Sequence, residues 1–358
     1  MVIAFDTNAV YTSQAGVARY VRGLLGALQS RPPAGMEVAP LAWPVENFSY
    51  VQPRRAWRTF YREFCWGGLV APGELKRMGA GLLHGTSEPF IHCPTGVREV
   101  LTLHDLALLR HPERFRAWHR RAGARRLQKY ARADQVICIS RFTAEEAMRL
   151  LGLPAKQMTV IYNGCDFAEA NAVPAEQPLV PAAPDEFFLF VGSLEPGKNL
   201  ALLKEVYALA AQQQKTLPPL LIVGARWEGV AGEGAAPAGW HYLGRQPDAV
   251  LVHLYRRARA LVFPSKYEGF GLPVVEAMAL GCPVVCSPVA SLAEVGGDAA
   301  LYAEQNAAAY LAAMQRLLAE PGLRPDLIAR GLAHVQQFTW RRCAGETAEV
   351  YRRVLSRA

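Results

Sequence analysis

Two runs of alternating apolar strands and amphipathic helices, separated by a stretch rich in Pro and Ala, constrain the fold of this 358-residue chain. In the first run, apolar segments such as residues 2–6, 98–105 and 135–140 alternate with segments of helical periodicity. A second alternation begins at residue 187. Strands that alternate with helices form parallel sheets. We therefore predict an α/β protein with two Rossmann-like domains, whose parallel sheets face a ligand cleft between the domains.

Composition sets the domain boundaries. Residues 168–184 are rich in Pro and Ala and lack a hydrophobic period, which is typical of a linker. The sequence thus predicts an N-terminal domain at 1–167 and a C-terminal domain at 185–340, followed by a terminal helix at 341–358. Two domains also match the length of the chain.

The start of the chain and its cysteines favour the cytoplasm. The first residues, MVIAFDTNAVYT, lack the charged and apolar regions of a signal peptide, and nowhere is there an apolar run long enough to span a membrane. The seven cysteines are odd in number and scattered, which favours a reducing compartment. Cys282 and Cys286 lack the further ligands of a zinc site, so we expect neither a metal nor a cofactor.

The positive charge of the chain belongs to its N-terminal half. Residues 1–167 contain 22 Lys or Arg against 13 Asp or Glu, whereas residues 168–358 contain 17 against 18. Much of the excess lies in residues 110–134, where basic and aromatic side chains are interleaved. Such a helix suits an anionic membrane surface or an anionic acceptor, and a plain solvated face is an equal alternative. No nucleic-acid-binding module accompanies it, so we expect no specific nucleic acid partner.

Residues 260–286 carry the most specific chemistry. An apolar strand leads through a glycine-containing turn into a short helix and then into a second buried strand. The free amides and the dipole at the helix start favour an anion, and Gly269 and Gly271 let backbone N–H groups approach it. Glu268 and Glu276 flank the same helix start. This arrangement predicts a nucleotide-sugar site, with diphosphate on the amides, ribose on one carboxylate and the transferred sugar near the other.

The stretch EGFGLPVVE, from Glu268 to Glu276, and the AMALGCPVV that follows resemble the E-x7-E signature of retaining glycosyltransferases of family four. Enzymes of this family have the GT-B fold, in which the last helix crosses back onto the N-terminal domain. The resemblance implies that Glu268 holds hydroxyls of the transferred sugar and that Glu276 holds the ribose. It also implies that the diphosphate is bound by Gly269, Phe270, Gly271 and Leu272.

A second part of the donor site is predicted directly after the strand FFLFV. The pattern G-x-x-x-x-G-K there ends at Lys198, but a true P-loop would carry Ser or Thr at Asn199 and no carboxylate at Glu195. The segment resembles instead the family's GTLEPRKN, whose basic side chains neutralise the donor diphosphate. Lys198 matches this pattern, whereas Ser193 and Gly197 stand where family members often carry arginine.

The N-terminal half contributes two further candidate positions. The segment TLHDL, which contains His104, resembles a family segment whose histidine contacts the donor sugar, and Gly16 resembles the family's glycine turn facing the phosphates. Each also has a structural interpretation, His104 as a packed core residue and Gly16 as the first residue of a helix. After Arg141, the spacing of Thr143 and Glu146 predicts a helix capped by Thr143.

Together the resemblances imply a retaining glycosyltransferase with His104, Lys198 and Glu268 as catalytic residues. The N-terminus, the cysteines and the basic N-terminal half predict that it is cytoplasmic and peripheral on the inner face of the membrane. The implied donor is a GDP- or UDP-hexose, with mannose as the expected sugar. The implied acceptor is a saccharide or lipid-linked saccharide of cell-surface polysaccharide or glycolipid synthesis, contacted by loops expected at 44–70 and 85–98. Two alternatives remain: a non-catalytic nucleotide-sugar-binding protein, motivated by the two missing arginines, and a GT-B sugar-nucleotide epimerase.

Overall fold

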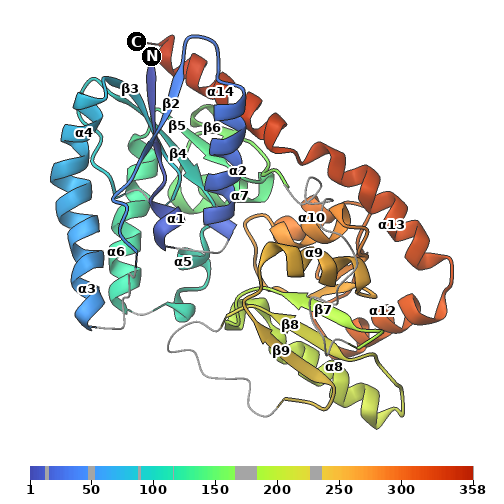
Figure 1. Ribbon diagram of the computed structural model, residues 1–358. Helices are drawn as coiled ribbons and strands as arrows, with labels where there is room; N and C mark the ends of the chain where they lie inside the picture. The colour runs from blue at the N-terminus through green and yellow to red at the C-terminus, as the bar shows by residue number, and fades with distance from the viewer. Residues whose placement is uncertain are drawn as a thin grey trace. The chain divides into compact units, whose positions relative to one another are not determined.

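The computed structural model describes residues 1–12, 16–46, 53–87, 90–115, 117–165, 184–225 and 236–357. It divides the chain into two compact units (Figure 1). The first unit comprises Met1–Gly164 and Phe338–Ala358, and the second comprises Cys165–Gln337. The predicted linker at 168–184 lies outside the described residues, apart from its last position. In the described part of the chain, no helix has the length and apolar surface needed to cross a bilayer.

A six-stranded parallel sheet forms the centre of the first unit, in the order β2-β1-β3-β4-β5-β6. Its strands are β1 Val2–Asp6, β2 Glu37–Leu41, β3 Ala80–Gly85, β4 Arg98–Leu103, β5 Gln135–Cys138 and β6 Met158–Val160. The α-helices are α1 Asn8–Thr12, α2 Gly16–Ser30, α3 Pro53–Phe60, α4 Ala71–Arg77, α5 Ala107–Arg110, α6 Ala117–Leu127, α7 Arg141–Leu151 and α14 Trp340–Leu355. A π-helix, η1 Tyr61–Val70, joins α3 to α4, and short 3₁₀ turns are η2 Pro112–Arg114, η3 Gln128–Arg132 and η4 Ala155–Gln157.

The strands of this sheet are mainly apolar because helices cover both faces. On β1, Ile3 and Phe5 pack in one core with α2 and α14. Their neighbour Ala4 points to the opposite face and packs in a core with Trp66 of η1. The parallel strands bring their carboxyl ends to one edge, where α/β proteins place ligand-binding groups.

The helix α14 packs against α2 within the first unit (Figure 1). Its cap is Thr339, whose hydroxyl accepts the backbone N–H of Arg342 at 3.2 Å. Trp340 lies so close to Gly23 of α2 that a Cβ there would be 2.1 Å from the indole ring. A Cβ on Gly164 would be 2.2 Å from the Trp340 backbone nitrogen. The two glycines thus leave the space that the start of α14 occupies.

Buried hydrogen bonds fasten α14 to the sheet. The Tyr351 hydroxyl lies 2.6 Å from His84 Nδ1, and His84 Nε2 lies 2.8 Å from Thr102 Oγ1. The same Thr102 oxygen lies 2.9 Å from the hydroxyl of Tyr20 on α2. Burial lowers the pKa of His84 to about 3, so its ring is neutral at physiological pH. A neutral ring has one donor and one acceptor nitrogen, which suits a hydroxyl on each side.

A second parallel sheet forms the centre of the second unit, in the order β12-β11-β10-β7-β8-β9. Its strands are β7 Phe188–Val191, β8 Leu220–Val223, β9 Trp240–Gly244, β10 Leu261–Phe263, β11 Val284–Cys286 and β12 Leu301–Tyr302. Its helices are α8 Leu200–Gln212, α9 Asp248–Arg257, α10 Leu272–Ala279, α11 Ser291–Gly296, α12 Ala307–Ala319 and α13 Leu323–His334, with 3₁₀ turns η6 Pro196–Lys198 and η7 Val335–Gln337. One core of this unit packs α8 and α12 against β7 and β8.

Two local predictions are wrong. The helix α7 is capped by Ser140, whose hydroxyl accepts the Thr143 amide at 3.0 Å, so Thr143 lies inside the first turn. A serine at the end of a strand can reach the N3 amide, and the helix therefore begins earlier than predicted. The loop expected at 44–70 contains α3 and η1 from residue 53 onward.

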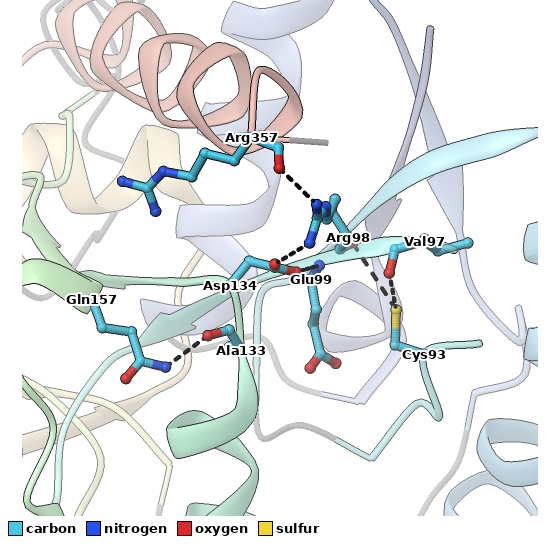
Figure 2. A network of polar contacts seen from close by, with 8 residues as sticks. All are labelled: Cys93, Val97, Arg98, Glu99, Ala133, Asp134, Gln157 and Arg357. Carbon is cyan, nitrogen blue, oxygen red and sulfur yellow. Dashed lines mark hydrogen bonds and ion pairs between the residues drawn. The ribbon is translucent and has the colours of Figure 1, made fainter. Parts of the chain in front are cut away.

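A polar network ties the start of β4 to the C-terminal end of the chain (Figure 2). Arg98 donates to Asp134 Oδ1 at 3.0 Å and to the Arg357 carbonyl at 3.1 Å. The other Asp134 oxygen accepts the backbone N–H of Glu99 at 2.8 Å. Burial raises the pKa of the Glu99 carboxyl to about 7; the nearby charge of Lys129 acts against the shift and that of Asp134 adds to it.

We expect Glu99→Gln to stabilise the protein at alkaline pH. Between the ordinary pKa of 4.5 and the folded value of about 7, the native state holds a proton that the unfolded state has released. The wild type therefore loses stability as the pH rises through this interval, whereas glutamine has no proton to lose. Allowing for partial exposure, the gain above the interval is about 1–2 kcal/mol, and below it the gain disappears.

Urea unfolding of the wild type and Glu99→Gln across this pH range measures the difference. The exposed Glu145 on α7 provides a matched Glu→Gln control. If Glu99→Gln stabilises the protein equally at all pH values, the carboxyl of Glu99 does not titrate in this range.

Candidate active site

The start of α10 is set by a glycine turn. After β10 the chain turns through residues 264–271, and Gly271 adopts φ +98° just before Leu272 begins the helix. This left-handed conformation strains any residue with a Cβ, and a Cβ at Gly271 would also be 2.6 Å from a Leu292 methyl group. The Gly271 carbonyl accepts the Val274 amide at 2.9 Å, which closes the first turn. The predicted anion-binding helix start thus has a defined backbone.

Lys198 and Glu268 meet at this turn. The Lys198 ammonium donates to Glu268 Oε1 at 2.5 Å, and the Ser265 hydroxyl donates to the same oxygen at 2.5 Å. The two loops are also joined by their backbones, since the Lys266 N–H donates to the Gly197 carbonyl at 2.8 Å. Among the described residues, Glu268 Oε2 accepts no hydrogen bond. The pair is half-buried. It combines a cation with a carboxylate whose Oε2 can still accept a hydrogen bond from a ligand hydroxyl.

Glu195 explains why the G-x-x-x-x-G-K pattern is not a phosphate cradle. Its buried carboxylate accepts the Gly197 N–H at 2.7 Å and caps the short turn η6. That amide is therefore already bound by an anion of the chain itself. Ser193 is half-buried in the same loop, and its carbonyl accepts the Glu195 amide at 3.0 Å. Lys198 is the predicted residue of this loop that reaches the turn before α10.

Glu276 is buried on the inner side of α10. Its side chain accepts a hydrogen bond from the Tyr255 hydroxyl of α9 at 3.1 Å, and only 3% of its surface is exposed. Phe270 in the preceding turn is also buried. A buried carboxylate that accepts hydrogen bonds suits recognition of a ligand hydroxyl, because desolvation strengthens each hydrogen bond it makes.

His104 and Gly16 belong to the first unit. His104 follows β4, and its Nε2 lies 2.7 Å from the Thr86 carbonyl, which can only accept, so Nε2 carries the proton. The Tyr20 ring packs edge-on against the His104 ring, with the ring centroids 4.9 Å apart. Burial lowers the pKa of His104, although the bond to Thr86 acts in the other direction. The imidazole is thus neutral, with Nδ1 as an acceptor. Gly16 is the exposed first residue of α2.

Sequence reasoning missed the residues that hold the candidate side chains in place. Ser265 and Tyr255 bind the two glutamates, and the Ser291 hydroxyl donates to the Glu268 carbonyl at 2.9 Å. The position of Ser265, between β10 and Glu268, was a usable signal, because parallel sheets place ligand groups at strand ends. Tyr255 and Ser291 carry no such signal, since each lies in a helix and contacts a residue more than twenty positions away in the sequence. No group of three potential metal ligands gathers within the described ranges.

Comparison with known proteins identifies the family. A model of the group 1 glycosyl transferases matches residues 175–334, and a model of glycosyltransferase family 4 matches residues 15–169. O-antigen chain mannosyltransferase B of Escherichia coli is 35% identical over 273 residues, which cover 71% of this chain and 70% of that protein. The chain is a group 1 glycosyltransferase of family four.

Two further proteins define the range of the similarity. The serotype-specific mannosyltransferase WbdA of Escherichia coli is 28% identical over 274 residues. The alignment covers 72% of this chain but only 34% of WbdA. Sucrose-phosphate synthase from Thermosynechococcus elongatus has a similar structure, with a TM-score of 0.75 and 22% identity over 100% of both chains. The predictions of a GT-B fold, of the family and of a glycosyltransferase enzyme are thereby confirmed. The roles of individual residues stay predictions.

Proposed function

We propose that this glycosyltransferase moves a hexose, with mannose as the expected sugar, from a GDP- or UDP-hexose to a saccharide or lipid-linked saccharide. The observation that carries the proposal is the contact of Lys198 with Glu268 beside the start of α10. It joins a cation for the departing diphosphate to a carboxylate for the sugar hydroxyls. The similarity to an O-antigen mannosyltransferase supports mannose and synthesis of a cell-surface polysaccharide.

In the proposed reaction the bond between the anomeric carbon and the diphosphate oxygen breaks while an acceptor oxygen bonds to that carbon on the same face. The anomeric configuration is therefore retained. Negative charge grows on the diphosphate, where Lys198 and the amides of 269–272 stabilise it. The departing phosphate oxygen takes the proton of the acceptor hydroxyl, so no carboxylate of the chain forms a covalent intermediate.

His104 is proposed to bind the reacting sugar. A neutral imidazole whose Nε2 proton is held by Thr86 offers Nδ1 as an acceptor for a sugar hydroxyl. The packing of Tyr20 on the ring fixes its orientation. Glu276 is proposed to accept hydrogen bonds from the ribose. Gly16, at the start of α2, and Ser193, in the loop of Lys198, are proposed to line the phosphates.

The acceptor is proposed to be reached at the inner face of a membrane. A lipid-linked saccharide is confined to a bilayer, so an enzyme that uses it gains from a cationic surface that binds anionic lipid. The excess of Lys and Arg in residues 1–167 supports this placement.

We expect Glu276→Ala to weaken donor binding by about 1–3 kcal/mol, because the nucleotide loses hydrogen bonds to a buried carboxylate. Tyr255→Phe is the matched control, since it removes the 3.1 Å hydrogen bond to Glu276 but keeps the carboxylate. Calorimetric titration of both variants and the wild type with GDP, UDP, ADP and their hexose conjugates measures the effect.

Selective binding of one nucleotide, weakened more in Glu276→Ala than in Tyr255→Phe, is the expected result. Equal donor affinity in Glu276→Ala and the wild type would remove Glu276 from the donor site. Thermal unfolding of each variant confirms that the comparison is made between folded proteins.

A further inference from the structure

Exposed apolar side chains are concentrated on one segment of the first unit. Of the nine large hydrophobic residues exposed in the described part of the chain, five lie between residues 57 and 70. Their exposed fractions are 57% for Trp57, 59% for Phe60, 58% for Phe64, 77% for Leu69 and 38% for Val70. The rings of Phe60 and Phe64 stack on each other, with centroids 4.8 Å apart.

The π-helical geometry of η1 brings these side chains together. Its hydrogen bonds join residues five apart, so one turn takes roughly four to five residues. Phe60, Phe64 and Leu69 are separated by four and five residues and therefore share one face. In an α-helix, Leu69 would lie opposite Phe60. Trp66 and Gly67 are buried on the other face of η1.

The inner face of η1 is held firmly. Arg62 donates to Glu63 Oε1 at 3.1 Å, and Arg126 of α6 binds the other oxygen of the same carboxylate. Trp66 is 3% exposed and packs in the sheet core. The apolar outer face is consequently presented by a fixed segment. The negative charge of Glu63 is also neutralised by two arginines.

Cations also lie on the helix next to η1. The ion pair of Arg126 with Glu63 places α6 beside η1 (Figure 1). Arg121 and Arg125 are exposed on α6, four residues apart and therefore on one side of it. Residues 53–77 and 117–132 together hold twelve Lys or Arg and two Asp or Glu.

We propose that this surface, Trp57, Phe60, Phe64 and Leu69 with Arg121 and Arg125, docks onto an anionic phospholipid bilayer. Aromatic and aliphatic side chains enter the boundary between headgroups and acyl chains, and the arginines bind lipid phosphates. Charge argues against a second copy of the chain as the occupant, because two such cationic surfaces repel each other.

The inference rests on the proposed membrane partner but not on the proposed donor. The test is therefore co-sedimentation without substrate, using vesicles of phosphatidylcholine alone and vesicles of phosphatidylcholine and phosphatidylglycerol in equal parts. The wild type is expected to sediment with the anionic vesicles only. Because each cation near the surface contributes about fivefold, Arg121→Gln/Arg125→Gln should lower binding at least about tenfold. Phe60→Ser/Phe64→Ser should lower it by a similar factor.

Matched controls alter apolar and basic side chains elsewhere. Met148→Ser/Leu332→Ser changes two other exposed apolar residues, and Arg342→Gln/Arg352→Gln removes the same charge from α14. Both should bind vesicles like the wild type.

Three outcomes would overturn the proposal: no binding to anionic vesicles, equal binding to neutral ones, or equal loss in variants and controls. A dimer in light scattering that Phe60→Ser/Phe64→Ser converts to a monomer would assign the surface to a second copy instead. If the protein binds vesicles but transfers no sugar, the proposed function is wrong and the membrane surface stands.

Discussion

Lys198→Ala is expected to lower kcat by about a hundredfold to a thousandfold, the range for loss of one group that stabilises a developing anion. The Lys198 ammonium is held 2.5 Å from Glu268 and 5.6 Å from the centre of the Phe263 ring, so its position is defined before donor binds. Diphosphate charge increases as the glycosidic bond breaks. The loss should therefore appear in kcat more than in KM.

Lys266→Ala is the matched control for this prediction. Lys266 is exposed in the neighbouring loop and contacts Gly197 through its backbone N–H, which alanine keeps. Steady-state kinetics of both variants should show wild-type kcat for Lys266→Ala. A Lys198→Ala enzyme with full turnover, or a similar loss in both variants, would take Lys198 out of the proposed mechanism.

Gly224→Ala is expected to destabilise the second unit by about 3–5 kcal/mol, combining backbone strain with overpacking. Gly224 follows β8 with φ +149°, and an added Cβ would lie 1.8 Å from the Gly192 carbonyl oxygen. Hydrogen bonds prevent either backbone from moving away. The Gly192 N–H donates to the Val223 carbonyl at 2.9 Å, and the Gly224 N–H donates to the Gly244 carbonyl at 2.8 Å. The loop that begins at Gly192 carries Lys198, so donor binding should also fall.

Gly26→Ala distinguishes a specific clash from a general effect of replacing glycine. No atom lies within 4 Å of the Cβ added there, and the residue is inside α2. Alanine should stabilise this helix by about 0.5–1 kcal/mol. Urea unfolding gives both values, and a Gly224→Ala variant as stable as the wild type would contradict the close approach of the two loops.

The regular part of the fold was predictable because strands of parallel sheets are nearly continuous runs of apolar residues in the sequence. The segment at residues 2–6 became β1 without a shift, and the run at 98–105 became β4 with its last two residues outside the strand. The helical segment from 53 to 70 was not recognised. In its second part, η1, the spacing of the apolar residues fits a π-helix rather than the period of an α-helix or a strand.

The candidate site was predictable as a set of residues but not as a set of contacts. Lys198 and Glu268 each stood in a segment with recognisable chemistry, yet their pairing depends on the packing of two loops seventy residues apart. The hydrogen bond of Tyr255 to the buried Glu276 likewise joins two helices, α9 and α10. Local patterns carry no information on such long-range contacts.

Hexose transfer at this site is tested most directly by incubation of the purified protein with GDP-mannose or UDP-hexoses and mannose-terminated oligosaccharides, with products analysed by mass spectrometry and NMR. We expect an acceptor lengthened by one hexose in the anomeric configuration of the donor, and loss of this product in Lys198→Ala. A donor that binds the protein but is neither transferred nor hydrolysed with any acceptor would contradict this expectation.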